Sequence, residues 1–252
     1  MMQVRRNAVA GLVVFATASL IAGCGSARER TAESEAGPTV ALTTAGGTAP
    51  TTSYAWLSSV LPDDKELTDA VGFQVRMDEP PSVGPRLRNT AAGSRELTES
   101  LCFGVVSPFE QQVYGVAPVR AVSYATESSV TFGAAAIDSA ADARDMFDAF
   151  ARQWRDCQGK TVLKIDGAYT YEHRITQVDA TPDVVSAVDA VMSSSPTGVL
   201  VRSQRALGVA KDCIVEVTVP ISESETNENP ITSSAATDLV NSMLARVRTV
   251  RR

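Results

Sequence analysis

Histidine is nearly absent from this sequence, which has 252 residues and a single histidine, His173. The HExxH motif and every two-histidine metal site are therefore excluded, because each needs a second imidazole. The motifs GxSxG and Ser-x-x-Lys, which mark the nucleophiles of common hydrolases, are also missing. No serine or cysteine stands beside His173 as a nucleophile, so we interpret it as an ordinary strand or loop residue. These absences predict a protein that is not an enzyme, with no catalytic residues, no bound metal and no cofactor.

Clusters of basic residues are scarce as well. The chain carries 23 Lys and Arg against 29 Asp and Glu, a formal net charge of −6. The exception is a group of arginines near the C-terminus, which we interpret as favourable charge at the end of a helix. This group consists of Arg246, Arg248, Arg251 and Arg252. Because nucleic-acid binding needs clustered positive charge, we predict no nucleic-acid partner.

A phosphate-binding loop is missing too. Gly159-Lys160-Thr161 matches only the last three positions of the phosphate-loop motif. The residue five places before Gly159 is Trp154, where the motif GxxxxGK[ST] needs a glycine. The segment also follows a predicted helix, whereas a phosphate loop follows a strand and opens a helix. We therefore reject a nucleotide site here.

The first residues of the chain have the layout of a secretory signal. Arg5 and Arg6 precede an apolar run from Ala8 to Ile21, which is too short to span a bilayer. Small residues lead to Cys24, and a cysteine directly after Ala-Gly resembles the bacterial lipobox, in which the cysteine receives a diacylglycerol. An ordinary signal peptide with an incidental cysteine is the alternative. We expect a lipoprotein signal peptide at residues 1–23, lipid on Cys24, and a location on the extracytoplasmic face of the cell membrane.

Two regions of different composition follow the signal. Residues 24–53 are rich in Thr, Ser, Ala and Gly and lack aromatics, so they cannot bury enough apolar surface to fold, and we predict a flexible stalk. Without residues 1–23 the chain keeps 21 basic and 29 acidic side chains. No later apolar run approaches membrane length, so lipid is the expected anchor. Residues 54–252 have globular composition and suffice for one domain with a real core.

The clearest helical pattern covers residues 139–156. Apolar residues recur at steps of four, three, four and three, which places them on one face. They are Ala143, Phe147, Phe150, Trp154 and Cys157. Ser139 can cap the first turn, and Gly159 stands where a left-handed cap is needed at the end. Further helices are predicted at residues 63–71, at Ser107–Tyr114 with Pro108 in its first position, and at Ile231–Val250.

Strands are predicted between and after these helices. They cover Val119–Thr126, Val130–Asp138, Lys160–Asp166, Ala168–Val178 and Asp183–Met192. Residues 198–219 predict a hairpin around Lys211-Asp212 whose apolar residues fall on odd numbers, which we interpret as half-buried, with one face against a helix. Those residues are Val199, Val201, Leu207, Val209, Cys213, Val215, Val217 and Val219. The element order predicts a single α+β domain, a twisted and largely antiparallel sheet packed with flanking helices.

Three cysteines remain once Cys24 is assigned to lipid. They are Cys102, Cys157 and Cys213. An exported chain can keep disulfides, so one pair and one leftover thiol are expected. Cys157 ends the buried face of the main helix, where a disulfide could fasten that helix to an earlier segment. The residues alone leave all three pairings open.

The order of these features resembles a known family. A lipobox and a Thr-rich stalk are followed by Cys-x-Gly at Cys102, a helix ending Phe150-x-x-x-Trp154-x-x-Cys157-x-Gly159, and a late strand Ile214–Val217. This order resembles that of mycobacterial lipoproteins whose folded part is similar to the extracellular sensor domain of the kinase PknH. The resemblance covers about Ala55 to Val250 of this sequence. The resemblance implies the same α+β fold, a disulfide between Cys102 and Cys157, a cleft for an unidentified ligand and no catalytic residues. The sensor domain of that kinase has a second disulfide, which cannot form here because only Cys213 is left.

The sequence and the resemblance together predict a lipid-anchored extracytoplasmic sensor or ligand-binding module of the cell envelope. Its expected partners are the membrane, through the lipid, and an unidentified small molecule or protein of the envelope. The alternative is a protein-interaction or scaffolding lipoprotein without a small-molecule ligand; an envelope hydrolase is a distant third, since nucleophile and base motifs are missing. A concave pocket with converging polar groups favours the first function, and a flat exposed apolar patch favours the second.

Replacing Cys24 by alanine is expected to release the protein from membranes, because the acyl chains contribute about 0.8 kcal/mol for each CH₂ buried in lipid. Detergent phase partitioning of host membranes measures this: the parent protein should enter the detergent phase and Cys24→Ala the aqueous phase. Cys213→Ala serves as the matched control and should behave like the parent. A Cys24→Ala protein that still partitions into detergent would contradict lipidation at this residue.

Overall fold

The computed structural model describes residues 53–250, apart from gaps at 78–79, 90–94, 97–98, 116–117, 128–129, 167, 196–197 and 222–233. The predicted signal peptide, Cys24 and the stalk up to residue 52 lie outside the described residues. The start of the predicted last helix, at residues 231–233, lies outside them too. Residues 50–252 form one compact unit. All the described strands and helices belong to this unit.

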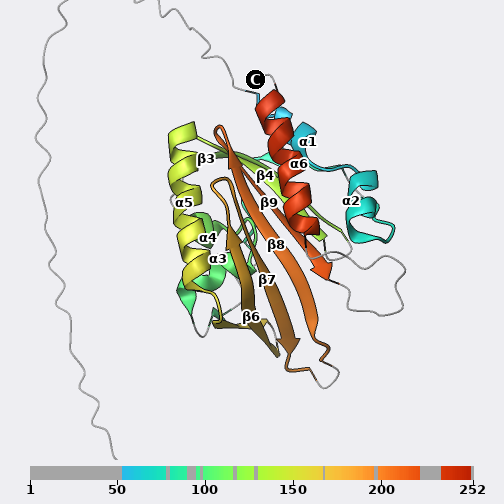
Figure 1. The fold of residues 1–252 in the computed structure, drawn as a ribbon, viewed down its shortest axis with the longest axis vertical. Helices are drawn as coiled ribbons and strands as arrows, with labels where there is room; N and C mark the ends of the chain where they lie inside the picture. The colour runs from blue at the N-terminus through green and yellow to red at the C-terminus, as the bar shows by residue number, and fades with distance from the viewer. Residues whose placement is uncertain are drawn as a thin grey trace, which may run out of the picture. The chain divides into compact units, whose positions relative to one another are not determined.

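One antiparallel sheet forms the centre of the domain (Figure 1). Nine described strands follow one another in the order β1-β3-β4-β9-β8-β7-β6-β5-β2. Strands of two residues lie at the two edges, β1 (Val83–Gly84) and β2 (Arg95–Glu96). The longer strands are β3 (Val119–Glu127), β4 (Val130–Ile137), β5 (Thr161–Asp166), β6 (Tyr169–Ala180), β7 (Val184–Ser193), β8 (Val201–Ala210) and β9 (Cys213–Ile221).

The path of the chain explains the strand order. After the β3–β4 hairpin, one long helix carries the chain over the sheet to β5. From there β5 to β9 run back as a meander until β9 pairs with β4. Every pairing between these strands is antiparallel. The predicted α+β fold, with one largely antiparallel sheet and flanking helices, is confirmed.

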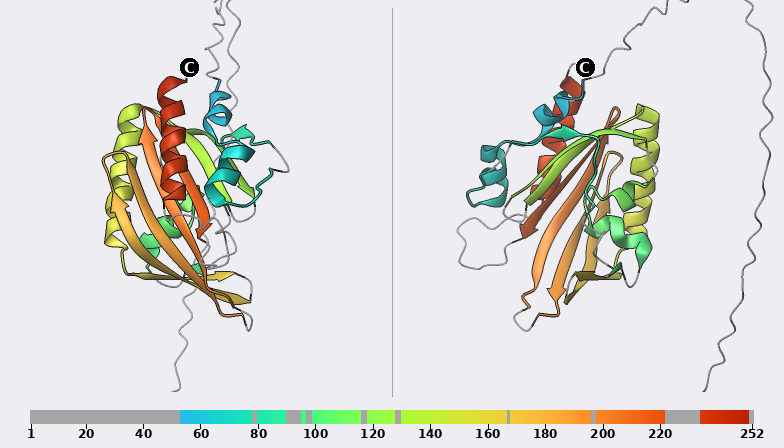
Figure 2. Two further views of the ribbon diagram at one scale, coloured as in Figure 1. Left: turned by 45° about the vertical axis from the view of Figure 1, so that its right-hand side comes forward. Right: turned by 180° about the vertical axis from the view of Figure 1, so that it is seen from behind.

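Helices cover both faces of the sheet (Figures 1 and 2). One face, the α5 face, is covered by α5 (Ala140–Asp156), α3 (Phe103–Val106) and α4 (Gln111–Tyr114), with a 3₁₀ turn at Ser100–Cys102 before them. The other, the α6 face, is covered by α1 (Trp56–Val60), α2 (Asp64–Val71) and α6 (Ala235–Thr249). Each face has its own hydrophobic cluster.

Local capping signals predicted helix ends correctly. The Ser139 hydroxyl accepts a hydrogen bond from the Asp142 N–H at 3.1 Å, which caps the start of α5. Gly159, just beyond its end, has a φ of +79°, in the left-handed region that favours glycine. The helix predicted at residues 63–71 is present as α2, with a capping box between Asp63 and Glu66. These interactions are local, so the sequence reveals them.

The β8–β9 hairpin shows that the predicted half-buried pattern is wrong. Its two-residue turn pairs Ala210 with Cys213, so an odd-numbered residue on β8 lies opposite an even-numbered residue on β9. Residues that lie opposite each other share a face. Leu207 and Val209 therefore pack on the α5 face. The odd-numbered residues of β9 pack on the α6 face, and they are Cys213, Val215, Val217 and Val219. Both faces of this hairpin are buried because both carry helices.

Only the second half of the predicted helix over Ser107–Tyr114 is present, as α4. The chain forms two one-turn helices, α3 and α4, with a break between them. At the break, Phe109 has a φ of +52°, a left-handed conformation that is unfavourable for a side chain of this size. The Phe109 carbonyl accepts from the Arg88 N–H at 2.8 Å, so a distant segment pairs with the break. The sequence pattern around Pro108 could not predict the break, because its partner, Arg88, lies about twenty residues earlier in the chain.

A disulfide joins Cys102 to Cys157, whose Cα atoms are 5.6 Å apart. This is the pairing that the family resemblance implied. It fastens the segment before α3 to the residue that follows α5. Cys213 is a free thiol buried on β9. Burial raises the pKa of the Cys213 thiol well above its usual value, so no reactive thiolate is available there.

Replacing Cys102 and Cys157 together by alanine should lower the free energy of unfolding by about 4 kcal/mol, because the bond closes a loop between residues 55 positions apart in the unfolded chain. Denaturant titration under oxidising conditions measures the loss. Parent protein with the bond reduced should match the double variant. Iodoacetamide should leave Cys213 unmodified until the protein unfolds, and peptide mapping without reduction that links Cys213 to another cysteine would overturn the pairing.

Candidate functional site

An arginine is buried between the sheet and the short helices of the α5 face. Arg205, on β8, is 1% exposed. Its Nη1 donates to the Gly104 carbonyl at 2.9 Å and also to the Val105 carbonyl. The guanidinium carbon lies 5.1 Å from the centre of the Trp154 ring. Arg205 thereby ties β8 to α3 and α5.

Glu216, on β9, supplies the opposite charge. Its Oε2 accepts from Arg205 Nη2, and its Oε1 accepts from the Tyr114 hydroxyl at 2.5 Å and from the Phe109 N–H at 3.4 Å. Burial raises the pKa of Glu216, and Arg205 and these other donors oppose the rise. Because the carboxylate is occupied by protein donors, we interpret the pair as structural.

The ion pair takes the place of helical hydrogen bonds at the break after α3. In a continuous helix the Gly104 carbonyl would accept from residue 108, but Pro108 has no N–H. The Val105 carbonyl would accept from Phe109. Instead, Arg205 donates to both carbonyls and Glu216 accepts from the Phe109 N–H. The pair therefore satisfies the backbone groups that the break leaves open.

A second buried pair contains the only histidine of the chain. His173 Nδ1, on β6, and Asp189 Oδ2, on β7, are 2.9 Å apart, with side chains 10% and 6% exposed. The other oxygen, Asp189 Oδ1, is buried and has no hydrogen-bond partner among the described residues. The sequence correctly predicted His173 in a strand, but it contained no signal for its aspartate partner on the next strand.

Lys164, on β5, lies near this pair. Its Nζ donates to the Ser107 hydroxyl at 3.1 Å and lies 5.3 Å from the centre of the Phe103 ring. Burial lowers the pKa of Lys164, and the charges of Glu110 and Asp189 oppose that shift. A serine beside a lysine is a possible nucleophile and base, but Ser107 is only 4% exposed. Because Ser107 is buried, we interpret the polar groups of this face as structural.

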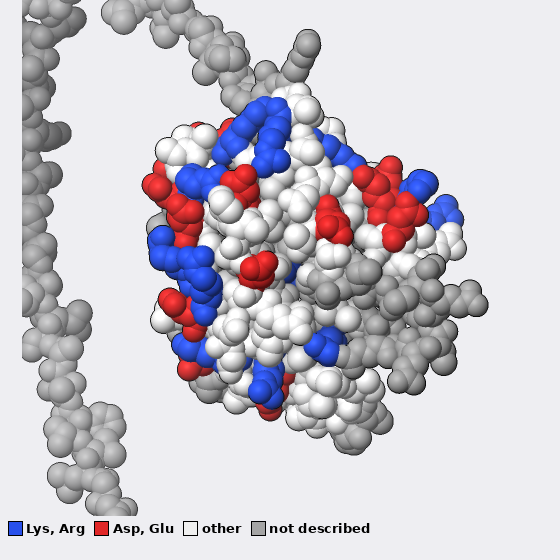
Figure 3. Space-filling view, viewed as in Figure 1, with Lys and Arg blue, Asp and Glu red and all other residues white. Residues whose placement is uncertain are grey.

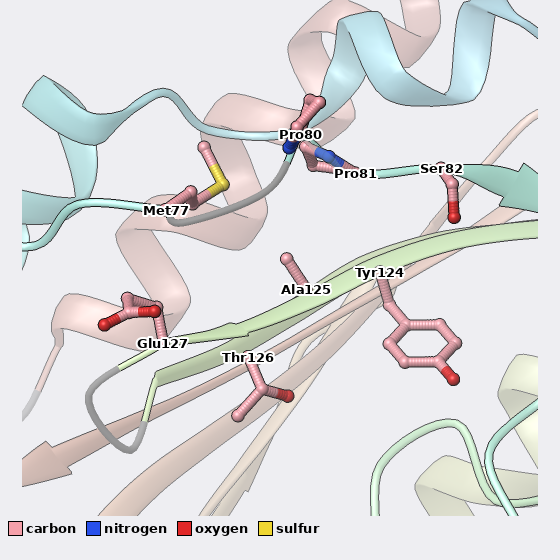
Figure 4. A pocket seen from close by; sticks show the side chains of 8 residues that line it. All are labelled: Met77, Pro80, Pro81, Ser82, Tyr124, Ala125, Thr126 and Glu127. Atoms are coloured by element: carbon pink, nitrogen blue, oxygen red, sulfur yellow. The ribbon is translucent and has the colours of Figure 1, made fainter.

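A hollow of about 500 Å³ lies at the edge of the sheet, between a proline segment and the end of β3 (Figure 4). Pro80 and Pro81 have no N–H to donate to β3, so the pairing of β1 begins only at Val83. Figure 4 shows Ala125 directed toward the prolines, with Tyr124 turned away from them. Few charged groups converge on this hollow, so we interpret it as a sheet edge held open by proline.

A second hollow, of about 520 Å³, opens on the α6 face over β6, β7 and β8. Arg174, Ala190 and Arg202 lie side by side across the three strands, so the alanine forms a floor between two arginines. Met192 and Leu200 add apolar side chains that are 43% and 50% exposed. Figure 3 shows that this lower part of the face is largely uncharged apart from scattered basic groups and a few acidic ones. Charged and apolar groups converge here, and we take this hollow, the face hollow, as the candidate binding site.

The residues singled out from the sequence have mostly structural roles. Gly159 follows α5 and Lys160 pairs with Glu99 at 3.1 Å, so the segment rejected as a phosphate loop is a helix end. The described residues contain no group of three or more His, Cys, Asp and Glu able to hold a metal ion. No helix in the described part of the chain is long and apolar enough to cross a membrane. The sequence did not predict the face hollow, because only strand register brings Arg174 and Arg202 to the same place.

Comparison with known proteins identifies one family. Residues 53–246 match the model of the PknH-like extracellular domain. Among solved structures, the chain is similar to the crystal structure of the extracellular domain of PknH from Mycobacterium tuberculosis, with a TM-score of 0.63 and 20% sequence identity. The match covers 77% of this chain and 95% of that one. At this identity the likeness shows the fold. Among curated proteins, no sequence matches significantly.

Replacing Arg205 by methionine is expected to lower the free energy of unfolding by about 3–5 kcal/mol, because Glu216 then remains buried without its counter-charge. Denaturant unfolding at neutral pH measures the change. The double variant Arg205→Met, Glu216→Leu should lose less than the sum of the single variants, because it removes both charges. Lys65→Met, which breaks an exposed ion pair with Asp69, is the control and should have no measurable effect. Equal losses for the control and Arg205→Met would contradict the structural role.

Proposed function

Because this chain belongs to the family of PknH-like extracellular domains, we propose that it is an extracytoplasmic sensor module that binds a small envelope component in the face hollow. The observation that carries the proposal is the convergence of Arg174 and Arg202 on the alanine floor at Ala190. Pockets that combine a few oriented polar groups with apolar walls are the usual form of a small-molecule site.

The geometry of the hollow indicates the chemistry of the ligand. Arg174 and Arg202 are two strands apart, which places their Cα atoms about 10 Å from each other. Each guanidinium can donate two parallel hydrogen bonds to a carboxylate or phosphate placed between them. Met192 and Leu200 can contact an apolar portion of the same molecule. The expected ligand therefore combines an anionic group with an apolar part.

The strands beneath the hollow offer a route from ligand to domain interior. Successive residues of a strand point to opposite faces, so Arg174 and Ala190 on the α6 face follow His173 and Asp189 on the α5 face. The buried pair joins β6 to β7 directly behind the hollow. A ligand that shifts these two strands relative to each other also changes the His173–Asp189 contact, which is what a sensor requires.

The domain organisation completes the proposal. We propose a signal peptide at residues 1–23, a lipid on Cys24 at the membrane, a stalk at residues 24–53 and the sensor domain at residues 54–252. Membership of an extracellular family supports a location outside the cytoplasm. The acidic chain, with a net charge of −6, remains a poor candidate for nucleic-acid binding.

The alternative is a scaffolding or protein-interaction lipoprotein without a small-molecule ligand. Exposed apolar side chains at the end of the sheet, such as Val199 and Leu200, are the observation that favours it. A hydrolase has less support, since the described serine beside a lysine, Ser107, is buried. The experiment below separates the first two functions.

Replacing Ala190 by tyrosine is expected to abolish ligand capture, because the new ring occupies the floor between the two arginines. Mass spectrometry of protein purified from the native host should detect a co-purified anionic molecule with the parent and not with Ala190→Tyr. Addition of envelope extract should raise the thermal midpoint of the parent only, since a ligand that binds the folded state stabilises it. Ala125→Tyr, which fills the edge hollow instead, is the matched control and should retain the ligand. Parent protein that carries nothing, with a midpoint indifferent to envelope extracts, would refute the binding function.

A further inference from the structure

One end of the sheet projects beyond the helices (Figures 1 and 2). Apolar side chains are exposed at this end. The start of β6, the end of β7 and the start of β8 meet there. We call the exposed side chains at this end the apolar tip. They are Tyr169 (45% exposed), Met192 (43%), Val199 (71%), Leu200 (50%) and Val201 (51%).

The apolar tip is not an ordinary scatter of surface side chains. It contains five of the eight large hydrophobic residues that are exposed in the described part of the chain. Val199, Leu200 and Val201 are consecutive, so their exposed side chains alternate between the two faces of the sheet at one hairpin end. Isolated exposed hydrophobics are normal in soluble proteins, whereas a continuous group marks a surface that meets another apolar phase.

The first turn of helix α6 marks the boundary between the buried core and the apolar tip. The Ala236 N–H, in the first turn of α6, donates to Gln204 Oε1 at 2.8 Å. On β8 the residues from Gln204 onward are buried, and those before it are not. Arg202 and the tip therefore lie beyond the reach of α6, and their exposure follows from the length of the hairpin.

Basic side chains border the apolar tip. Arg202 follows Val201 along β8, and Arg174 lies two strands away in the same register. One residue of a strand advances about 3.3 Å, so a guanidinium on Arg202 lies one to two residues behind the tip. Long arginine side chains keep their charge in water while their stems follow apolar surface. Glu172 is the acidic side chain that lines the hollow beside them.

We propose that the apolar tip inserts into the surface of an anionic lipid layer, with Arg174 and Arg202 on its headgroups. Apolar side chains near the end of the hairpin and basic side chains farther from it match the two depths of such a surface. The inference rests on the proposed function in one respect. The face hollow opens beside the tip, so the anionic and partly apolar ligand of the hollow comes from the lipid layer.

The tip is a separate lipid contact from any anchor at the amino end. The first described helix, α1, and the end of α6 lie together at the opposite end of the domain (Figure 1). When the tip is docked on a lipid surface, α1, where the described chain begins, therefore lies at the end of the domain away from that surface. Two further occupants of the tip, a second copy of the chain and an apolar protein partner, give different results in the test.

Sedimentation of the compact unit, residues 50–252, with lipid vesicles tests the proposal without an acyl anchor. The unit should bind vesicles that contain phosphatidylglycerol more tightly than vesicles of phosphatidylcholine alone. Val199→Ser and Leu200→Ser should each weaken binding about tenfold, since each withdraws an aliphatic side chain from lipid. Arg174→Gln with Arg202→Gln should remove the preference for the anionic vesicles and leave weak binding to both kinds.

A matched control separates the tip from general surface hydrophobicity. Leu101 is 74% exposed and lies before α3, far from the tip in the sequence and on another segment, so Leu101→Ser should leave vesicle binding unchanged. Leu101, Arg174, Val199 and Leu200 are exposed and Arg202 is half-buried, so the thermal midpoint of each variant is measured beside its vesicle binding, and a midpoint that matches the parent excludes unfolding as the cause. Absence of vesicle binding by the parent, or an equal loss with Leu101→Ser, would overturn the inference. A dimer in solution that Leu200→Ser dissolves would assign the tip to a second copy instead.

The same variants keep this test apart from that of the proposed function. Ala190→Tyr fills the face hollow and leaves the tip intact, so it should retain vesicle binding while it loses the co-purified ligand. Vesicle binding without any captured ligand would leave the lipid contact standing and remove the sensor function. A captured ligand without vesicle binding would do the reverse.

Discussion

The buried ion pair between Arg205 and Glu216 is the contact on which the α5 face depends. Two charges withdrawn from water must be surrounded by donors and acceptors, and here the chain between α3 and α4 supplies them. Pro108 cannot donate a helical hydrogen bond and Phe109 does not, so the backbone groups left open at the break match the needs of the pair. The irregular segment and the ion pair therefore require each other. The disulfide before α3 and the sheet beneath hold both in place.

The sequence predicted the features whose causes are local. The caps of α5 at Ser139 and Gly159, and the fold class implied by the element order, depend on neighbours within a few residues. The face of each β-hairpin strand could not be predicted in the same way, because period-two alternation within a strand says nothing of how two strands align. The pairing register determines that alignment. It places the odd-numbered residues of β8 on the α5 face and those of β9 on the α6 face.

The candidate site was hidden for the same reason. Arg174 and Arg202 belong to strands separated by β7, and neither stands in a motif. Likewise, Glu216 looks like a solvent-facing charge in an alternating strand until a second helical layer covers it, and Arg205 interrupts the odd-numbered apolar positions of the pattern. A sheet with helices on both faces makes every central strand position an interior one, so its few polar residues either pair with each other or lie where a helix ends. The buried pairs are the first case, and the face hollow beyond α6 is the second.

The prolines beside β3 matter when many copies of the domain are tethered to the same membrane. Proteins tethered to a membrane, as proposed for this one, diffuse in two dimensions and meet neighbours at a far higher effective concentration than in free solution. A nine-residue outer strand that only two residues of β1 cover would then invite strand-to-strand polymerisation. Pro80 and Pro81 run along that edge and offer no N–H to a neighbour. Crowding can therefore concentrate these domains without pairing β3 of one domain with a strand of the next.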